Sequence, residues 1–119
     1  MAADWFKCKG DVWCDLFKIN LNHETLKMTG VFIIWIEDGN SRKVLRVGKG
    51  DIEDELTKCK NDIVMQAFMH KGLKVSFTPV IESQCKSIEV YLYRTLSPTV
   101  NGSIPSGLPI KINLPWKQY

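Results

Sequence analysis

The sequence predicts a small α+β domain in which helices flank a mixed β-sheet and an extended, proline-rich C-terminal tail follows. The chain has 119 residues, the size of one domain, and its 45% hydrophobic and 24% charged residues are typical of globular proteins. Apolar residues follow a strand-like pattern in some segments and a helix-like pattern in others. Four of the five prolines lie after residue 97, which predicts a non-helical end to the chain.

Three segments in the first half of the chain are predicted to be strands. Phe17–Asn22 alternates apolar and polar residues, as a half-buried strand does. Val31–Ile36 is a continuous apolar run rich in β-branched and aromatic residues, which favours a strand over a helix. Turn-forming residues 38–41 connect it to a strand at Lys43–Val47, so these two strands are predicted to form a β-hairpin. The segment Gly48–Gly50 is predicted to end the second strand.

Two helical segments are predicted to follow the hairpin. Asp51 is placed to cap the first, and the apolar residues after it fall on one helical face. The helix is predicted to restart at Asn61-Asp62 and to continue from Ile63 to His70. Gly72 is predicted to end it as a C-cap.

The last regular elements are a strand and a helix. Leu73–Ile81 alternates as a strand does, and Pro79 marks either its end or an edge position. Ser83 or Ser87 is expected to cap the helix that follows, and Pro98 ends it. The tail is predicted to pack back on the domain, or to add a short strand, through four apolar residues: Ile110, Ile112, Leu114 and Trp116.

Hydropathy and charge exclude several classes of protein. No apolar run is long enough to cross a bilayer, so neither a transmembrane helix nor a membrane partner is expected. Residues 1–10 lack the apolar core and the cleavage site of a secretory signal, which makes the cytoplasm the expected compartment. The net charge of +3 is too small to indicate a nucleic-acid partner by itself.

The cysteines show no C-x-x-C spacing. In a reducing compartment they are expected to be free thiols. The alternative is a zinc site that combines Cys8 and Cys14 with a histidine, although this spacing matches no common zinc pattern. The four cysteines are Cys8, Cys14, Cys59 and Cys85.

By themselves the residues assemble no standard catalytic set, since the chain has no Walker loop, nucleophile elbow or HExxH motif. Structural explanations exist for the polar and aromatic residues of interest. Phe32 is explained as a strand residue of the core, and Arg46 as an outward-facing strand residue. Glu89 is explained by the dipole at a helix N-terminus, and Asn101 by a turn.

Several short motifs nevertheless occur in an informative order. Gly30-Val31-Phe32 lies on the first hairpin strand, and Arg46-Val47-Gly48 lies on the second. The last helix carries Ile88-Glu89 with Tyr91-Leu92, and Leu96-Ser97-Pro98 with Asn101 follows it. In this order the chain resembles the GIY-YIG endonuclease superfamily over residues 30–101. The resemblance implies one domain over residues 1–119, in which an N-terminal strand and the tail are added to that core.

The resemblance implies a nuclease fold and cleavage of phosphodiesters with one divalent metal ion, Mg²⁺ or Mn²⁺. Glu89 matches the glutamate that holds the metal in the family, and Asn101 matches the asparagine of the turn after the last helix. A divalent ion prefers such a hard carboxylate oxygen. Glu89, Phe32, Arg46 and Asn101 are therefore the candidate catalytic positions, expected on one concave face.

Three of the family's catalytic groups are replaced. Phe32 and Arg46 stand where the family has tyrosines, and Glu55 stands where it has an arginine, unless Lys58 supplies the cation from one helical turn later. Phe32 has no hydroxyl with which to activate water. The reversed charge at Glu55 removes a group that would stabilise the phosphate. Hydrolysis is therefore expected to be weak or lost.

Three functions are the resulting alternatives. The first is weak metal-dependent cleavage of phosphodiesters. The second is binding of nucleic acid, DNA in the first place, without catalysis, through five basic residues: Arg42, Lys43, Arg46, Lys49 and Lys58. The third is a protein-interaction module that keeps only the fold, because a fold alone does not determine a function.

Overall fold

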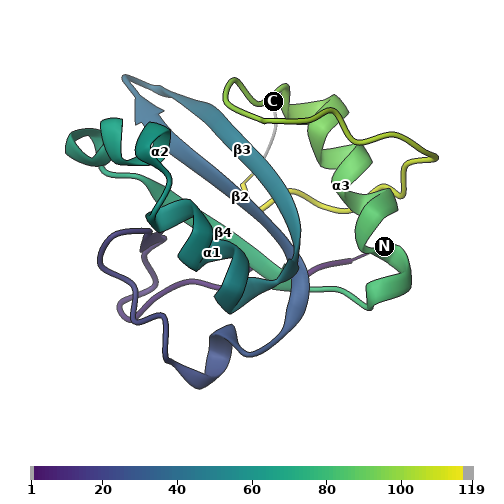
Figure 1. The fold of residues 1–119 in the computed structure, drawn as a ribbon, viewed down its shortest axis with the longest axis horizontal. Coiled ribbons are helices and arrows are strands. Elements are labelled where there is room, and N and C mark those ends of the chain that lie inside the picture. The colour runs from purple at the N-terminus through teal and green to yellow at the C-terminus, as the bar shows by residue number, and fades with distance from the viewer. Residues whose placement is uncertain (1, 117–119) are drawn as a thin grey trace.

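The computed structural model describes residues 2–116, which form one four-stranded sheet with helices on both faces (Figure 1). The strands lie in the order β1 (Cys14–Asp15), β4 (Lys74–Pro79), β2 (Thr29–Asp38) and β3 (Ser41–Asp51). The predicted α+β class is confirmed. The expectation of a mixed sheet is wrong, because every neighbouring pair of these strands is antiparallel. β4 returns along the free edge of β2 instead of joining β3, with which it would run parallel.

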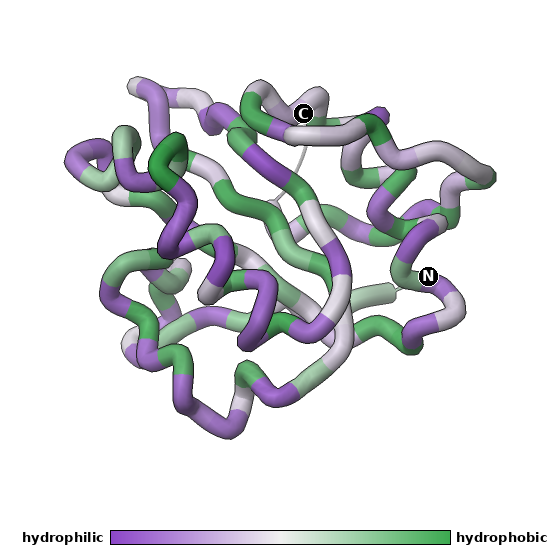
Figure 2. Tube along the Cα trace, in the orientation of Figure 1, coloured by the Kyte–Doolittle hydropathy of each residue, from purple (hydrophilic) through white to green (hydrophobic). Residues whose placement is uncertain are grey.

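The helices α1 (Ile52–Lys60) and α2 (Ile63–Ala67) cover one face of the sheet, and α3 (Glu82–Leu96) covers the other (Figure 1). Alternate residues of β2 enter two separate cores. Phe32, Ile34 and Ile36 pack on the α1 side, and Val31 and Ile33 pack on the α3 side. Figure 2 shows the middle of this central strand mostly in the green of hydrophobic residues. Burial on both faces explains why its sequence is uniformly apolar instead of alternating.

The β2–β3 hairpin confirms the predicted turn, since Asp38 pairs with Ser41. A bulge then changes the register within β3, because Ile34 pairs with Arg46 while Trp35 pairs with Val44. The extra residue turns both Leu45 and Arg46 toward the α1 side of the sheet, where Leu45 enters the core. The bulge therefore aims Arg46 at α1, an orientation that simple alternation from Leu45 would not give.

The second hairpin strand does not end at Val47, as predicted, but continues through Gly48–Gly50 to Asp51. Gly48 pairs with Phe32, and a Cβ atom at Gly48 would lie 2.3 Å from Cζ of the Phe32 ring. The glycine is required there because the aromatic ring occupies the space that a side chain would need. Glycine in this strand therefore marks a close approach and does not mark a break.

We predict that Gly48→Ala lowers the free energy of unfolding by about 1–3 kcal/mol, because the new methyl group overpacks against Phe32. Urea denaturation would measure the change. Gly102→Ala is the matched control, since a Cβ atom there meets nothing within 4 Å and should leave stability nearly unchanged. Equal effects of the two substitutions would contradict the packing described for Phe32.

The predicted strand at Phe17–Asn22 is wrong, and the segment forms turns. The backbone carbonyl of Asp15 accepts hydrogen bonds from the N–H groups of Lys18 and Ile19, and its side chain accepts one from Phe17 N–H at 2.8 Å. This local bonding folds the chain back on itself. The alternating pattern arises because Phe17 and Ile19 pack against the core from a turn.

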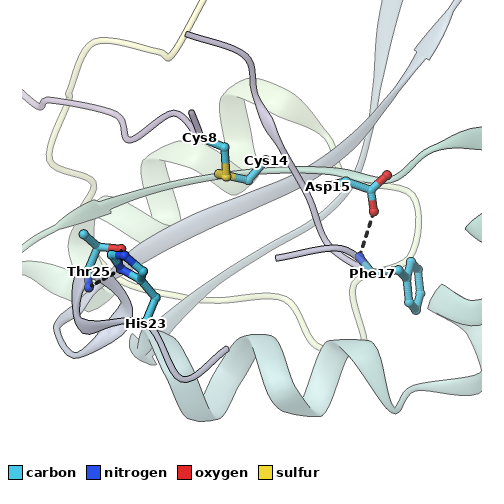
Figure 3. Close-up of a disulfide and its surroundings, with 6 residues drawn as sticks. All are labelled: Cys8, Cys14, Asp15, Phe17, His23 and Thr25. Atoms are coloured by element: carbon cyan, nitrogen blue, oxygen red, sulfur yellow. Dashed lines mark hydrogen bonds between the residues drawn. A yellow bond between two sulfur atoms is a disulfide. The ribbon is translucent and has the colours of Figure 1, made fainter. Parts of the chain in front are cut away.

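Cys8 and Cys14 form a disulfide, which corrects the expectation that they are free thiols (Figure 3). A hairpin-like bridge between Cys8 and Val12 brings the two cysteine Cα atoms to 5.0 Å. Their thiolates are therefore not available for the zinc site considered above. Cys59 and Cys85 are free, as expected, and both are buried. Disulfides are typical of oxidising compartments, so the cytoplasmic location stays a prediction.

The predicted cap of the first helix is confirmed. Asp51 accepts a hydrogen bond from Asp54 N–H at 3.1 Å, and Asp62 accepts one from Val64 N–H at 2.8 Å. No serine caps α3, which begins after Ile81 without a side-chain cap. The segment after Asp62 is also shorter than predicted. α2 ends at Ala67, and two short 3₁₀ helices are present at η1 (Glu24–Leu26) and η2 (Met69–Lys71), the latter ended by Gly72 as predicted.

Residues 97–116 form neither helix nor strand but wrap around the sheet. The N–H groups of Thr99 and Val100 donate to the carbonyls of Val44 and Leu45, so this segment covers the outer edge of β3. The four apolar tail residues named above pack on the α3-side core, as one of the two alternatives predicted. Residues 117–119 lie outside the described part of the chain.

Asn113 fastens the tail to the N-terminal segment. Its side-chain amide donates to the Ala3 carbonyl at 2.9 Å and accepts from the Ala3 N–H at 2.6 Å, and the indole of Trp5 donates to its backbone carbonyl. The two ends of the described chain are therefore joined directly. Within residues 2–116, no helix has the length and apolarity needed to cross a membrane.

Candidate functional site

A cavity of about 350 Å³ lies along β3, at the open side of the sheet. Residues from both faces reach it, because α1 contributes from one side, α3 from the other, and the tail closes one end. All four candidate catalytic positions line this cavity, together with Lys49 and Lys58. The lining residues are Phe32, Arg46, Val47, Gly48, Lys49, Glu55, Lys58, Cys59, Glu89, Asn101, Gly102 and Ser103.

Phe32 forms an apolar part of the cavity wall. Its side chain is 2% exposed, and the far end of its ring lies against Gly48, which also lines the cavity. A tyrosine at this position would place its hydroxyl at that end of the ring. Phenylalanine has no group that can accept or donate a proton there.

The Arg46 side chain connects four parts of the chain through hydrogen bonds. Its guanidinium donates to Asp62 Oδ2 at 3.4 Å, to the Val100 carbonyl at 3.3 Å and to Cys59 Sγ at 3.8 Å. These bonds join β3 to α1, to the cap of α2 and to the tail. The side chain is 22% exposed, and its Nε is buried without a partner among the described residues. Most of the hydrogen-bonding capacity of Arg46 is thus used within the protein.

Asn101 is held against β3 by its own side chain. Its Oδ1 accepts a hydrogen bond from the Val47 N–H at 3.0 Å, and its Nδ2 donates to the Ser103 carbonyl at 3.4 Å. The side chain therefore satisfies a backbone group on the edge strand and shapes the turn that carries Gly102 and Ser103. Asn101 positions the tail at the cavity.

Glu89 projects from α3 and is half-buried. Burial raises the pKa of the Glu89 carboxyl above its ordinary value, while the ammonium of Lys49 opposes the increase and the carboxylate of Glu55 adds to it. Glu55 is itself paired with Lys58 at 2.9 Å. Gly50 allows Glu55 to lie across the strand, because a Cβ atom at Gly50 would be 3.3 Å from its Cγ. Two carboxylates therefore influence each other in one cavity.

The cavity offers a carboxylate oxygen, the kind of ligand that a divalent cation of the Mg²⁺ type would need. Such an ion is often held by one or two carboxylates and completed by water and substrate phosphates. Glu89 supplies one such carboxylate, and a cation would offset the burial that disfavours its charged form. No group of three or more potential metal-ligating side chains occurs within residues 2–116, so a closed, all-protein metal site is not formed there.

Of the five basic residues proposed to bind nucleic acid, the structure brings three together at the cavity: Arg46, Lys49 and Lys58. Arg42 lies elsewhere, with its guanidinium 5.5 Å from the ring of Trp35 and 5.1 Å from the ring of Trp116. Lys43 is exposed and does not line the cavity. Lys49 and Lys58 are the cations with exposed side chains at the site.

Sequence reasoning missed two residues that shape the site. Asp62 was expected only at the restart of a helix, yet it caps α2 and also pairs with Arg46. Cys59 was expected only on the inner face of α1, yet its sulfur meets the same guanidinium and lines the cavity. No sequence signal connects these residues to Arg46, because the bulge in β3 determines which way its side chain turns.

Comparison with protein-family models, curated proteins and solved structures finds no match to this chain.

We predict that Glu89→Gln raises the free energy of unfolding at pH 7. Because folding raises the pKa of this carboxyl, the folded state favours its protonated form, and ionised Glu89 therefore lowers stability. Glutamine cannot ionise. The gain should shrink as the pH falls through the folded-state pKa and vanish below the unfolded-state pKa.

Urea denaturation at pH 7 and at acidic pH would measure this difference. Glu37→Gln, at an exposed position outside the cavity, controls for the loss of one negative charge. A Glu89→Gln protein that is less stable than the wild type at pH 7 would show that the burial of this carboxyl is compensated in some other way.

Proposed function

We propose that the chain is a divergent GIY-YIG-like domain whose cavity along β3 binds nucleic acid, with weak or lost metal-dependent hydrolysis of phosphodiesters. One observation carries the proposal. Phe32, Arg46, Glu89 and Asn101 come from four separate parts of the chain, and all line one cavity. The motifs that carry the resemblance are therefore brought together in space, as a shared site requires.

The residues of the cavity divide into those that would hold a metal and those that would meet a phosphate. Glu89 would hold Mg²⁺ or Mn²⁺, which would supply Lewis-acid stabilisation of phosphate charge. Lys49 and Lys58 would attract the phosphate backbone. Arg46 is largely engaged with Asp62 and the tail, which limits what it can contribute.

The composition of the cavity favours binding over catalysis. Among the described lining residues, three are basic and two are acidic, so the attraction to a phosphate backbone is modest. The hydroxyl that could act on water is missing at Phe32. The carboxylate of Glu55 stands where a cation is expected, and Lys58 neutralises it only in part. We expect little or no turnover by the wild-type chain.

We predict weak duplex-DNA binding, with a dissociation constant of roughly 10⁻⁴ to 10⁻⁶ M at physiological salt. The double substitution Lys49→Ala with Lys58→Ala should weaken DNA binding by the same factor for all DNA sequences. The slope of log K against log salt should fall by about 0.9 for each phosphate that the variant no longer neutralises. Fluorescence anisotropy over a salt series would measure both effects. Lys18→Ala with Lys71→Ala, both exposed and outside the cavity, is the charge-matched control.

We predict that Phe32→Tyr combined with Glu55→Arg raises metal-dependent DNA cleavage by at least about 100-fold over the wild type. The first substitution adds a hydroxyl and the second adds a fixed cation, each a type of group worth at least about 100-fold. Branched, single-stranded and duplex DNA with Mg²⁺ or Mn²⁺ are the substrates to assay. Adding Glu89→Ala to this variant should abolish the gain. Cleavage that survives Glu89→Ala would refute the assignment of the site.

The second candidate function is a protein-interaction module. It is favoured by exposed apolar side chains on the α1 side of the molecule, where Ile63 is 81% exposed and Met69 is 50% exposed. If the chain binds no DNA at low salt, this candidate replaces nucleic-acid binding.

A further inference from the structure

A second cavity, of about 360 Å³, lies among the N-terminal loops. Its size is within the range of sites that hold small molecules. It shares no lining residue with the cavity along β3, so a ligand bound here would be independent of the function proposed above. The residues that line it are Lys7, Cys8, Lys9, Cys14, Lys18, Ile19, Asn20, His23, Thr25 and Leu26.

The inner part of this N-terminal cavity is apolar. Leu26 and Cys14 are buried, and Ile19 packs beside them against the core. The disulfide between Cys8 and Cys14 forms part of the wall and closes the loop that carries Lys9. Figure 3 shows the disulfide together with His23 and Thr25, which line the same cavity. An apolar group of a ligand can therefore pack here against a wall that the disulfide holds in place.

The rest of the lining is basic. Among the described lining residues, four are basic and none is a carboxylate. Lys7 is held by Asp11 at 3.7 Å and lies over the ring of Trp13. Lys9 and Lys18 are exposed and form no ion pair with a described carboxylate. These two ammonium groups are the ones available to an anion.

His23 adds a donor. Its Nδ1 accepts a hydrogen bond from the Thr25 N–H at 3.1 Å, which caps the short helix η1. A neutral imidazole that accepts at Nδ1 carries its proton at Nε2. The second ring nitrogen is therefore a hydrogen-bond donor.

The acidic groups of the same N-terminal segment are engaged with other partners. Asp11 binds Lys7, Glu24 binds Lys27, and Asp15 accepts the Phe17 N–H. Apart from Asp11 on Lys7, none of them is paired with a basic residue of the cavity lining. An anion supplied from solution would complete the basic side of the cavity.

We propose that this N-terminal cavity binds an amphipathic anion, namely a carboxylate on a medium-length alkyl chain. The alkyl chain lies along the disulfide, Ile19 and Leu26, and the carboxylate faces Lys9 and Lys18. An apolar interior with a basic margin matches both halves of such a molecule. A purely inorganic anion would leave the apolar part unused, and a neutral lipid would leave the ammonium groups unused.

The test is calorimetric titration of the full chain with octanoate, octan-1-ol and octylammonium. Octanoate should bind at least about tenfold more tightly than octan-1-ol, and octylammonium should not bind. Along the series butanoate, hexanoate and octanoate, the affinity should rise by about fourfold for each added methylene group until the cavity is filled.

Two variants localise the effect. Lys9→Ala with Lys18→Ala should weaken octanoate binding by about tenfold and leave octan-1-ol binding unchanged. Lys43→Ala with Lys71→Ala removes the same charge outside this cavity and should have no effect. Amide NMR shifts on adding octanoate should cluster at residues 7–9 and 18–26.

Three results would each overturn the proposal. The first is equal affinity for octanoate and octan-1-ol. The second is an affinity that does not depend on chain length, which would indicate an adventitious ion contact. The third is a set of octanoate-induced amide shifts that lies outside residues 7–9 and 18–26, or a loss of octanoate binding in the Lys43→Ala, Lys71→Ala control.

Discussion

The guanidinium of Arg46 is the interaction on which the arrangement of the candidate site depends. A mostly buried cation must be matched by acceptors, and Arg46 finds them on Asp62, Cys59 and the Val100 carbonyl. These acceptors belong to α1, to the cap of α2 and to the tail. One side chain on the edge strand thus sets how both helices and the tail approach it. Without the guanidinium, these acceptors would lose their hydrogen-bond donor.

Much of the fold could be predicted because its signals are local. The apolar run of β2, the turn at residues 38–41 and the cap at Asp51 each act within a few residues. The errors have non-local causes. Gly48 suggested a break because glycine is rare inside strands, but its role depends on the ring of Phe32 on the neighbouring strand. The turn at Phe17 imitates a strand because its apolar residues reach the core from a loop.

The candidate site also has some features that the sequence predicts and others that it does not. Motif order led to Phe32, Arg46, Glu89 and Asn101, and these share a cavity. The partners of Arg46 could not be predicted from the sequence. A bulge in β3 reverses the direction of the Arg46 side chain, and no residue pattern predicts that bulge. The disulfide was missed for a related reason. Cysteine spacing and the expected compartment both favoured free thiols at Cys8 and Cys14, whereas their proximity comes from the bridge between Cys8 and Val12.

The clasp formed by Asn113 has a mechanical consequence. Because Asn113 binds Ala3 and Trp5, the described chain is nearly a closed ring, with its ends tied on one side of the sheet. Tension applied at the two ends would load this clasp before it reached the ladder between β2 and β3. Hydrogen bonds of a single asparagine yield at lower force than a whole strand pair. The sheet is therefore shielded until the clasp opens.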